Sequence, residues 1–443
     1  MFARLAGVAA VIASTAIASA EPLSADDLAK KDEGGYVTGL PLAAYSTDIG
    51  VGVGARAYYY WDGDRKDARF ATTPYLFRTF LQVFASTRGI QFHWLDFDIP
   101  KVFDSPYRFR SQIIYARNIN QNYFGVGDRS LAPLKFPGSP SSYDTFSAFS
   151  DAENVVLPDG STYSKYNQYD LLKPTAIASV ERLLLDDRLR VLGGLGFSYV
   201  RVHDYTNKQI DDANGVSGIE NQTKLAEDCA AKTIVGCNAL ASGQFENYLR
   251  LGVSYDTRDF EPDPNTGVFI DGEADIATIA LGSSYDYIRG LIAARGYLSP
   301  FDGHDIVLAG RFVIVGQTNG APFFSMDNFP FTDDPRQGLG GHRTLRGYRQ
   351  DRFIGSVMTV INAEVRWTFA HATWWRQKFA FIAAPFVDAG RPYDSLAELT
   401  YKDWKPSYGA ALRISWNLAT IATIDYGISP EDSGLYINFN HIF

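Results

Sequence analysis

The strongest constraint on this chain is a period-two alternation of apolar and polar residues in segments of ten residues or more. In "INAEVRWTF", Ile361, Val365 and Phe369 fall on one face, while Asn362 and Glu364 fall on the other. Successive side chains of a β-strand point to opposite faces. Soluble strands average roughly 5–6 residues, whereas a strand tilted across a bilayer needs about ten. The pattern therefore favours a closed transmembrane β-barrel over a soluble β-sandwich, because only closure satisfies every lipid-exposed backbone group.

Composition supports strands and excludes one class of partner. The 443 residues include 30 Phe, 26 Tyr and 39 Gly but only 3 Met, a balance typical of strands and turns. The formal net charge is -9, which argues against nucleic acid as a partner.

We predict an all-β fold, a 16-stranded antiparallel transmembrane β-barrel, from the alternating segments and their turns. The predicted strands are 35–44, 49–61, 69–83, 89–99, 106–119, 168–183, 189–203, 245–257, 268–280, 286–298, 305–316, 355–369, 378–390, 407–417, 419–429 and 435–443. With this count the long connections all fall at one end of the barrel, as in outer-membrane barrels with long surface loops. Pro41 interrupts the first strand, which an edge or seam position tolerates.

The N-terminus predicts export. Arg4 precedes an apolar run over 5–17, and Ala18-Ser19-Ala20 supplies a small-residue cleavage site, so residues 1–20 are interpreted as a signal peptide rather than a membrane anchor. Residues 21–34 would form a short periplasmic segment and residues 35–443 the barrel. The expected location is the outer membrane of a Gram-negative cell.

Two further features concern export and the membrane. Cys229 and Cys237, the only cysteines, most simply form a disulfide in an exported protein; metal binding is the weaker reading, since no histidine lies near them in sequence. Tryptophans near the predicted short-turn strand ends suggest an interfacial aromatic girdle. They are Trp61, Trp374 and Trp375.

The final strand ends in aromatic residues. Leu435, Ile437, Phe439 and Phe443 share one face, an arrangement that resembles the signal by which barrel-assembly machinery recognises outer-membrane proteins. His441 stands where an apolar residue is more usual. We therefore expect that machinery to be a partner during this chain's own insertion.

An arginine recurs at every third position of the stretch 340–353, at Arg343, Arg346, Arg349 and Arg352. These arginines could bind a phosphate group, form the basic face of a helix, or form buried ion pairs in a loop that plugs the barrel. The chain has no G-x-x-x-x-G-K-[ST], G-x-S-x-G or H-E-x-x-H pattern, so we expect no enzymatic activity, metal or cofactor. An arginine brought inward by this loop could bind Glu364 and Asp388, on adjacent predicted strands, through charge-assisted forked hydrogen bonds.

Five segments resemble the BamA/TamA-like outer-membrane assembly factors, also called bacterial surface antigens. They are "NYFGVGD" (122–128), "DTRDFEPDPNTG" (256–267), "RGY" (346–348), Glu364 in "NAEVRW" and Asp388 in "FVDAG". The resemblance implies that a large surface loop folds into the barrel and that Arg346 contacts Glu364 and Asp388. Gly347 would permit the turn and Tyr348 would pack against the inner wall. The other three loop arginines match no family position and are expected to be solvated or to face lipopolysaccharide.

The resemblance implies membrane insertion, assembly or export of proteins or lipids through weak pairing of the first and last strands. Partners would be outer-membrane lipids, lipopolysaccharide and unfolded outer-membrane protein clients. The family's usual periplasmic peptide-binding domains are not expected, since only about fifteen residues separate Ala20 from the first strand. Two alternatives stay open: a passive diffusion pore, and a surface receptor or adhesin that acts through loops 120–167 and 204–244.

Overall fold

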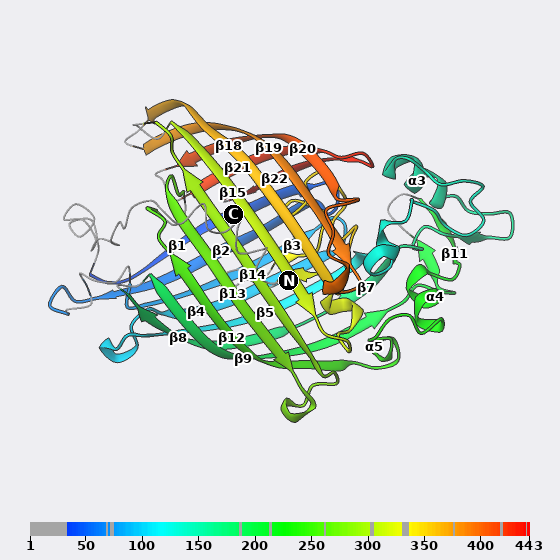
Figure 1. Cartoon of the computed structure of the whole chain (residues 1–443), viewed down its shortest axis with the longest axis horizontal. Helices are drawn as coiled ribbons and strands as arrows, with labels where there is room; N and C mark the ends of the chain where they lie inside the picture. Colours follow the sequence, from blue (N-terminus) through cyan, green and yellow to red (C-terminus); the bar gives the residue numbers. More distant parts are fainter. Residues whose placement is uncertain are drawn as a thin grey trace.

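The computed structural model shows one antiparallel sheet closed into a barrel, with a smaller layer of helices and short strands at one end (Figure 1). It describes residues 33–67, 70, 75–185, 188–211, 215–260, 263–301, 305–329, 336–374, 377–416, 420–439 and 441–443. The predicted signal peptide and most of the predicted segment 21–34 lie outside these residues, as does Trp375.

Sixteen crossings form the barrel wall, which confirms the predicted count. The strands are β1 (Gly34–Ser46), β2 (Gly50–Gly63), β3 (Phe77–Ser86), β4 (Ile90–Ile99), β5 (Tyr107–Asn122), β7 (Gln168–Leu172), β8 (Thr175–Leu184), β9 (Leu189–His203), β12 (Gln244–Asp256), β13 (Gly267–Ala277), β14 (Tyr287–Leu298), β15 (Ile306–Gln317), β18 (Val357–Trp374), β19 (Gln377–Tyr393), β20 (Lys405–Trp416), β21 (Thr420–Ile428) and β22 (Ser433–Phe439).

Two of the differences from the predicted strands involve segments that contain a proline. The sixth crossing is split into β7 and β8, which both pair with β5 on either side of Pro174, because proline has no N–H to donate to the ladder. The third strand was predicted to begin at residue 69 but begins at Phe77; Pro74 lies in the segment that the prediction assigned to it.

The alternation separates a lipid-facing surface from the lumen. In β18, Ile361 and Val365 are exposed, whereas Asn362, Glu364 and Arg366 are buried inside the barrel. Inward charges of the wall are paired with one another. Two examples join Arg250 Nε to Asp275 Oδ1 at 2.8 Å and Arg295 Nη1 to Asp271 Oδ2 at 2.6 Å.

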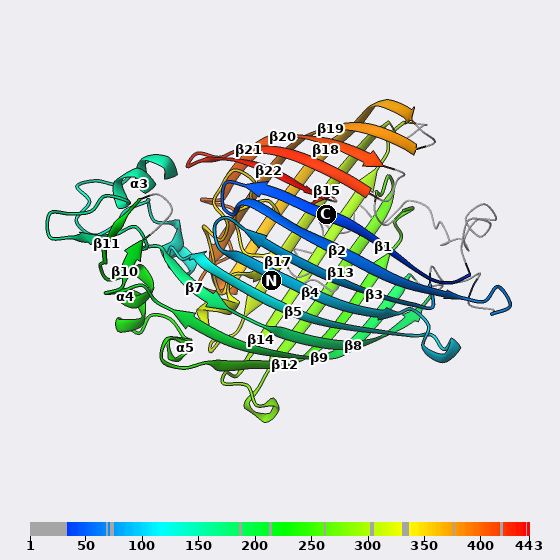
Figure 2. The same ribbon diagram turned by 180° about the vertical axis from the view of Figure 1, so that it is seen from behind.

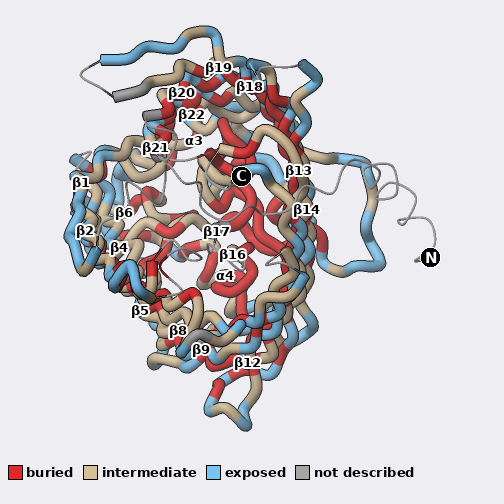
Figure 3. Tube along the Cα trace, turned by 90° about the vertical axis from the view of Figure 1, so that its left-hand side faces the viewer, coloured by how far each residue is buried: buried red, intermediate tan, exposed pale blue. Residues whose placement is uncertain are grey.

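The described parts of the connection between β15 and β18 lie inside the barrel. They contain η6 (Phe323–Ser325), β16 (Asn328–Phe329) and β17 (Arg336–Gln337). Figure 3, a view along the barrel, places β16 and β17 in the middle of the ring of strands. Leu339, Leu345, Tyr348 and Phe353 of this connection form a buried cluster with inward residues of β14, β15 and β18. Hereafter residues 336–356 are called the plug loop.

A cap covers the long-loop end of the barrel. It comprises α3 (Phe146–Glu153), β6 (Ser161–Thr162), β10 (Gln209–Asp211), β11 (Ser217–Glu220), α4 (Lys224–Ala230) and α5 (Asn238–Ala241). Strand β11 pairs antiparallel with β10 and parallel with β6. Threonine hydroxyls cap both longer helices, since Thr145 and Thr223 accept hydrogen bonds from helix N–H groups. None of the helices described for this chain has the length and apolar character of a membrane span.

Two of the carboxyl groups buried in the cap are Glu153, at the end of α3, and Glu220, at the end of β11. Each has one carboxylate oxygen without a hydrogen-bond partner. Burial raises the pKa of Glu220 to about 8, opposed by Lys165, whose backbone N–H donates to Glu220 Oε2 at 2.9 Å. Burial, followed by repulsion from Glu220, raises the pKa of Glu153 well above its usual range, and Lys165 and Arg349 oppose this shift. Asp204 adds a smaller upward contribution to the pKa of Glu220.

We expect the cap to lose stability as the pH rises from 4.5 to about 8. In that window the folded cap holds protons that the unfolded chain has released, so the free energy of unfolding falls with increasing pH. Hydrogen exchange of cap amides, corrected for intrinsic rates, should show less protection at pH 8.5 than at pH 5.5. Glu220→Gln should reduce this dependence, whereas Asp151→Asn, a change at an exposed residue of α3, should not. Protection that rises with pH would contradict the assignment.

Candidate functional site

Arg346 of the plug loop lies at the centre of a buried charge cluster in the lumen. Its Nε and Nη2 donate to the two oxygens of Asp388, each at 2.9 Å. Its Nη1 donates to Glu364 Oε1 at 2.9 Å and to Asp425 Oδ2 at 3.0 Å. All four side chains are fully buried. The structure thus places Arg346, Glu364 and Asp388 in contact, as the sequence motifs suggested.

Three members of this cluster were not predicted. Asp425 of β21 is the third carboxylate on Arg346. Arg413 of β20 donates to both oxygens of Glu364, at 2.8 and 2.7 Å, and Arg366 of β18 donates to Glu364 Oε2 at 3.0 Å. Three arginines therefore face three carboxylates, a balance that a buried cluster needs because an unpaired charge in the interior is costly.

Gly347 brings the plug loop against the wall. Its φ is +97°, a conformation that favours glycine, and a Cβ there would lie 2.8 Å from backbone atoms of Ile428. Its N–H donates to the Tyr436 hydroxyl at 3.0 Å. The next residue, Tyr348, is buried and its ring packs on Phe353 with a centroid distance of 5.2 Å. These contacts fix the turn that places the Arg346 side chain against its carboxylate partners.

The expectation that the other loop arginines are solvated was wrong for two of them. Arg352 is fully buried; its Nε donates to Glu431 Oε2 at 2.8 Å and its Nη1 to the Ser130 carbonyl at 2.6 Å. Arg349 Nε lies 2.7 Å from Asp432 Oδ2. The acidic partners lie in the turn between β21 and β22, far from the loop in sequence. Arg343 is half-buried and donates to the His441 carbonyl at 3.5 Å.

The barrel closes where β22 lies beside β1 (Figure 2). Among the residues that the structure describes, only two pairs join them, Tyr45 with Ile437 and Ser46 with Tyr436, whereas β21 and β22 share seven and β1 and β2 share thirteen. Pro41 lies in the part of β1 beyond these two pairs, where its missing N–H costs no seam hydrogen bond. We refer to the β1–β22 contact as the seam.

The plug loop holds the seam at its long-loop end. Arg349, which pairs with Asp432 just before β22, also donates from Nη1 to the Thr47 carbonyl just after β1, at 2.7 Å. The backbone N–H of Gln350 donates to Asp48 Oδ1 at 3.0 Å. One loop thereby bridges the two strands of the barrel wall whose described residues share the fewest register pairs.

The end of the chain departs from the predicted final strand. β22 stops at Phe439, and residues 441–443 are buried in the lumen. The Ile442 carbonyl accepts from Arg311 at 3.1 Å and the Phe443 carbonyl accepts from Arg366 at 2.9 Å. His441 contacts Arg413 through Nδ1 at 2.7 Å and Asp263 through Nε2 at 2.8 Å. Phe443 therefore does not lie on the lipid face of β22, because residues 441–443 turn into the lumen to contact Arg311, Arg366 and Arg413.

The backbone of Phe439 pairs with Ala422 of β21. A role of Phe439 and Phe443 in recognition by assembly machinery stays a prediction. Trp61 and Trp374 are exposed near the short-turn ends of β2 and β18, as an interfacial girdle requires.

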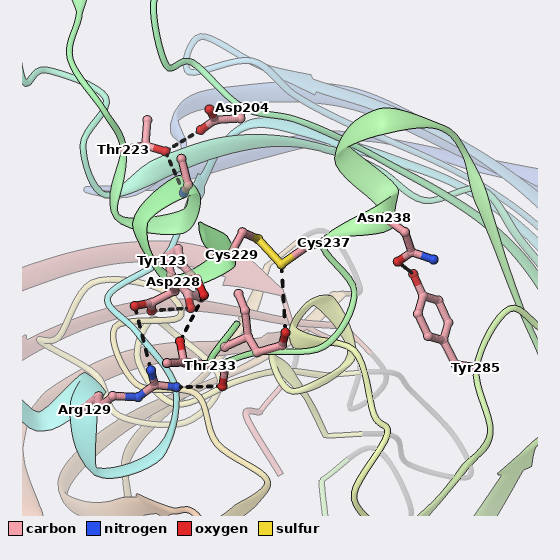
Figure 4. The surroundings of a disulfide bond; sticks show 12 residues. Tyr123, Arg129, Asp204, Thr223, Asp228, Cys229, Thr233, Cys237, Asn238 and Tyr285 are labelled. Atoms are coloured by element: carbon pink, nitrogen blue, oxygen red, sulfur yellow. Dashed lines mark hydrogen bonds and ion pairs between the residues drawn. A yellow bond between two sulfur atoms is a disulfide. The ribbon is translucent and has the colours of Figure 1, made fainter. Parts of the chain in front are cut away.

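Cys229 and Cys237 form a disulfide that ties α4 to the start of α5, with the Cα atoms 5.7 Å apart. Figure 4 shows Tyr123 and Arg129 gathered around the neighbouring Asp228, whose Oδ2 accepts from the Tyr123 hydroxyl at 2.7 Å. The disulfide lies in the cap, away from the charge cluster of the lumen. Within the described part of the chain, no group of three or more His, Cys, Asp or Glu side chains is placed to hold a metal ion.

A closed antiparallel barrel with an apolar outer face, a charged lumen and an inward-folded surface loop defines a transmembrane barrel of the outer-membrane class. A family model described as the Omp85 superfamily domain matches residues 100–440. The chain therefore belongs to the Omp85 superfamily, in agreement with the BamA/TamA-like resemblance. A second model, a domain of unknown function named DUF5982, matches residues 13–76; its described part includes β1 and β2 of the barrel.

Solved structures show the same fold at low sequence identity. BamA from Haemophilus ducreyi lacking POTRA domains 1–3 is similar with a TM-score of 0.55 and 13% identity, over 93% of this chain and 70% of that one. CdiB from Escherichia coli is similar with a TM-score of 0.52 and 9% identity, over 91% of this chain and 62% of that one. No curated protein matches the chain.

Proposed function

We propose that this barrel inserts or exports proteins at the outer membrane, with the seam as the place where a client strand enters. The observation that carries the proposal is the seam itself, because only two register pairs join β1 to the described residues of β22. The rest of β1 then offers backbone N–H and C=O groups that another strand can pair with, which is the chemistry of β-augmentation.

Arg346 acts in this proposal as a structural latch. Its contacts with Glu364, Asp388 and Asp425 hold the plug loop inside the barrel. The loop in turn reaches both sides of the seam through Arg349. The latch therefore holds the long-loop end of the seam, which must open for a client strand to pair along the whole of β1, while the remainder of β1 stays available.

A passive pore is less well supported. The lumen holds the plug loop, residues 441–443 and the ion pairs of the wall, and the loop packs in a buried apolar cluster rather than along an open channel. The proposed location is the outer membrane, with the cap at the cell surface. The proposed partners are outer-membrane lipids, lipopolysaccharide, unfolded outer-membrane proteins and the machinery that inserts this chain.

Disulfide capture of a client tests the proposal. A cysteine replaces Val37 of β1, which is 72% exposed, and a second cysteine is placed in the last strand of an unfolded outer-membrane barrel. We expect a mixed disulfide to form during client folding. Val253→Cys on β12, also lipid-facing, is the matched control. Equal capture at both positions would show that β1 has no special role.

A further inference from the structure

The cap contains a cavity that the proposed insertion activity does not use. It encloses about 530 Å³ between the segment 132–137, the start of α4 and Tyr166, a size within the roughly 300–1,000 Å³ of small-ligand sites. Aromatic walls come from Phe124, Phe136 and Tyr166, of which Phe124 and Tyr166 are largely buried. The cavity belongs to the cap and not to the lumen.

Three cations line this cavity and none of its lining residues is acidic. Arg129 and Lys224 are partly neutralised by Asp228, at 3.8 and 2.8 Å. Lys135 is exposed, and across the residues that the structure describes it has no ion pair. The cavity therefore presents positive charge to an entering ligand, with Lys135 free to bind it.

We propose that this cavity binds an acidic hexose, either a uronic acid or a hexose phosphate. The anionic group would bind Lys135 and Arg129 by charge-assisted hydrogen bonds. The apolar face of the ring would pack on the aromatic walls. Such a sugar can come from a lipopolysaccharide headgroup or from a free saccharide at the cell surface. The site is independent of the seam.

Isothermal titration of the full barrel tests the site. The protein is kept in lauryldimethylamine oxide micelles, because sugar-based detergents would compete. The probes are glucuronic acid, glucose 6-phosphate, glucose and inorganic phosphate. We expect the two acidic sugars to bind saturably, and glucose and phosphate to bind at least about tenfold more weakly. Absence of saturable binding by either acidic sugar, or phosphate binding as tightly as glucose 6-phosphate, would overturn the assignment.

Two substitutions locate the binding. Lys135→Ala should weaken glucuronic acid binding by about tenfold, because it removes one charge-assisted contact. Lys208→Ala, at another exposed lysine of the cap outside the cavity lining, is the matched control and should bind as the unsubstituted protein does. Both changes are at exposed positions, and both variants should fold clients at the unsubstituted rate. Equal affinity of the two variants for glucuronic acid would disprove the site.

Reconstitution distinguishes the two sources of the sugar. In vesicles that contain lipopolysaccharide, loss of glucuronic acid binding relative to lipopolysaccharide-free vesicles would identify the membrane headgroup as the occupant. Retained binding would identify a free saccharide. Either result supports an acidic-hexose site, provided that Lys135→Ala weakens the binding seen in lipopolysaccharide-free vesicles.

Discussion

Arg346→Ala should release the plug loop and lower the stability of the barrel by about 3–5 kcal/mol, the cost typical of breaking a buried ion pair from one side. The substitution leaves Glu364, Asp388 and Asp425 buried with one guanidinium fewer between them. The denaturant midpoint of barrel unfolding and the rate at which protease cleaves within residues 336–356 would measure the effect. We expect a lower midpoint and faster cleavage.

Two controls separate the latch from a general effect of charge. Arg343→Ala removes the same charge from the same loop, but among the described residues the Arg343 side chain donates only to the His441 carbonyl, at 3.5 Å, so both readouts should stay close to those of the unsubstituted barrel. The midpoint and the cleavage rate of Arg346→Lys should lie between those of Arg343→Ala and Arg346→Ala, because a lysine keeps the charge but cannot reproduce the forked contact with Asp388. If Arg346→Ala behaved like Arg343→Ala, Arg346 would not be a latch.

Locking the seam should abolish client insertion. Tyr45 and Ile437 are register partners across the seam, and directly opposed residues of an antiparallel pair have Cα atoms about 4.5–5.5 Å apart, within reach of a disulfide. In a Tyr45→Cys, Ile437→Cys double variant, oxidation should reduce the rate of client folding to the rate in empty liposomes. Reduction should restore it. The folding rate of an unfolded client barrel, followed with and without reductant, is the measurement.

The matched control locks a pair of strands away from the seam. Leu412 of β20 and Ile424 of β21 are register partners, both about 45% exposed to lipid. Their double cysteine variant should fold clients equally fast in both redox states. The native Cys229–Cys237 disulfide also responds to reductant, and this control reports that contribution. A seam-locked barrel as fast as its reduced form would mean that clients do not enter between β1 and β22.

The barrel could be predicted because its signal is local. In each strand apolar and polar residues alternate, because one face of the strand contacts lipid. In β18 this pattern correctly placed Glu364 inside the barrel. The contact of Arg346 with Glu364 and Asp388 was reached through family motifs and opposite charge. The sequence signal that Asp425 and Arg413 belong to this charge cluster is weaker. They occupy inward positions of predicted strands, but their approach to Arg346 depends on how far neighbouring strands are staggered around the barrel.

The end of the chain and the cap could not be predicted for different reasons. Apart from His441, the alternation continues through Phe443 in the sequence, and this single histidine is too weak a signal to indicate that residues 441–443 leave the strand for Arg311 and Arg366. The cap consists of short helices and strands without a sustained period. Its shape depends on contacts between segments far apart in sequence, such as the pairing of β6 with β11.

Client folding is the measurement that tests the central proposal most directly. The purified barrel is reconstituted in liposomes, and the folding of a urea-unfolded small outer-membrane barrel is followed over time beside empty liposomes and the Arg346→Ala variant. We predict faster folding with the barrel than in empty liposomes, and a different rate with the variant. Equal rates with and without the barrel would contradict insertion at the seam.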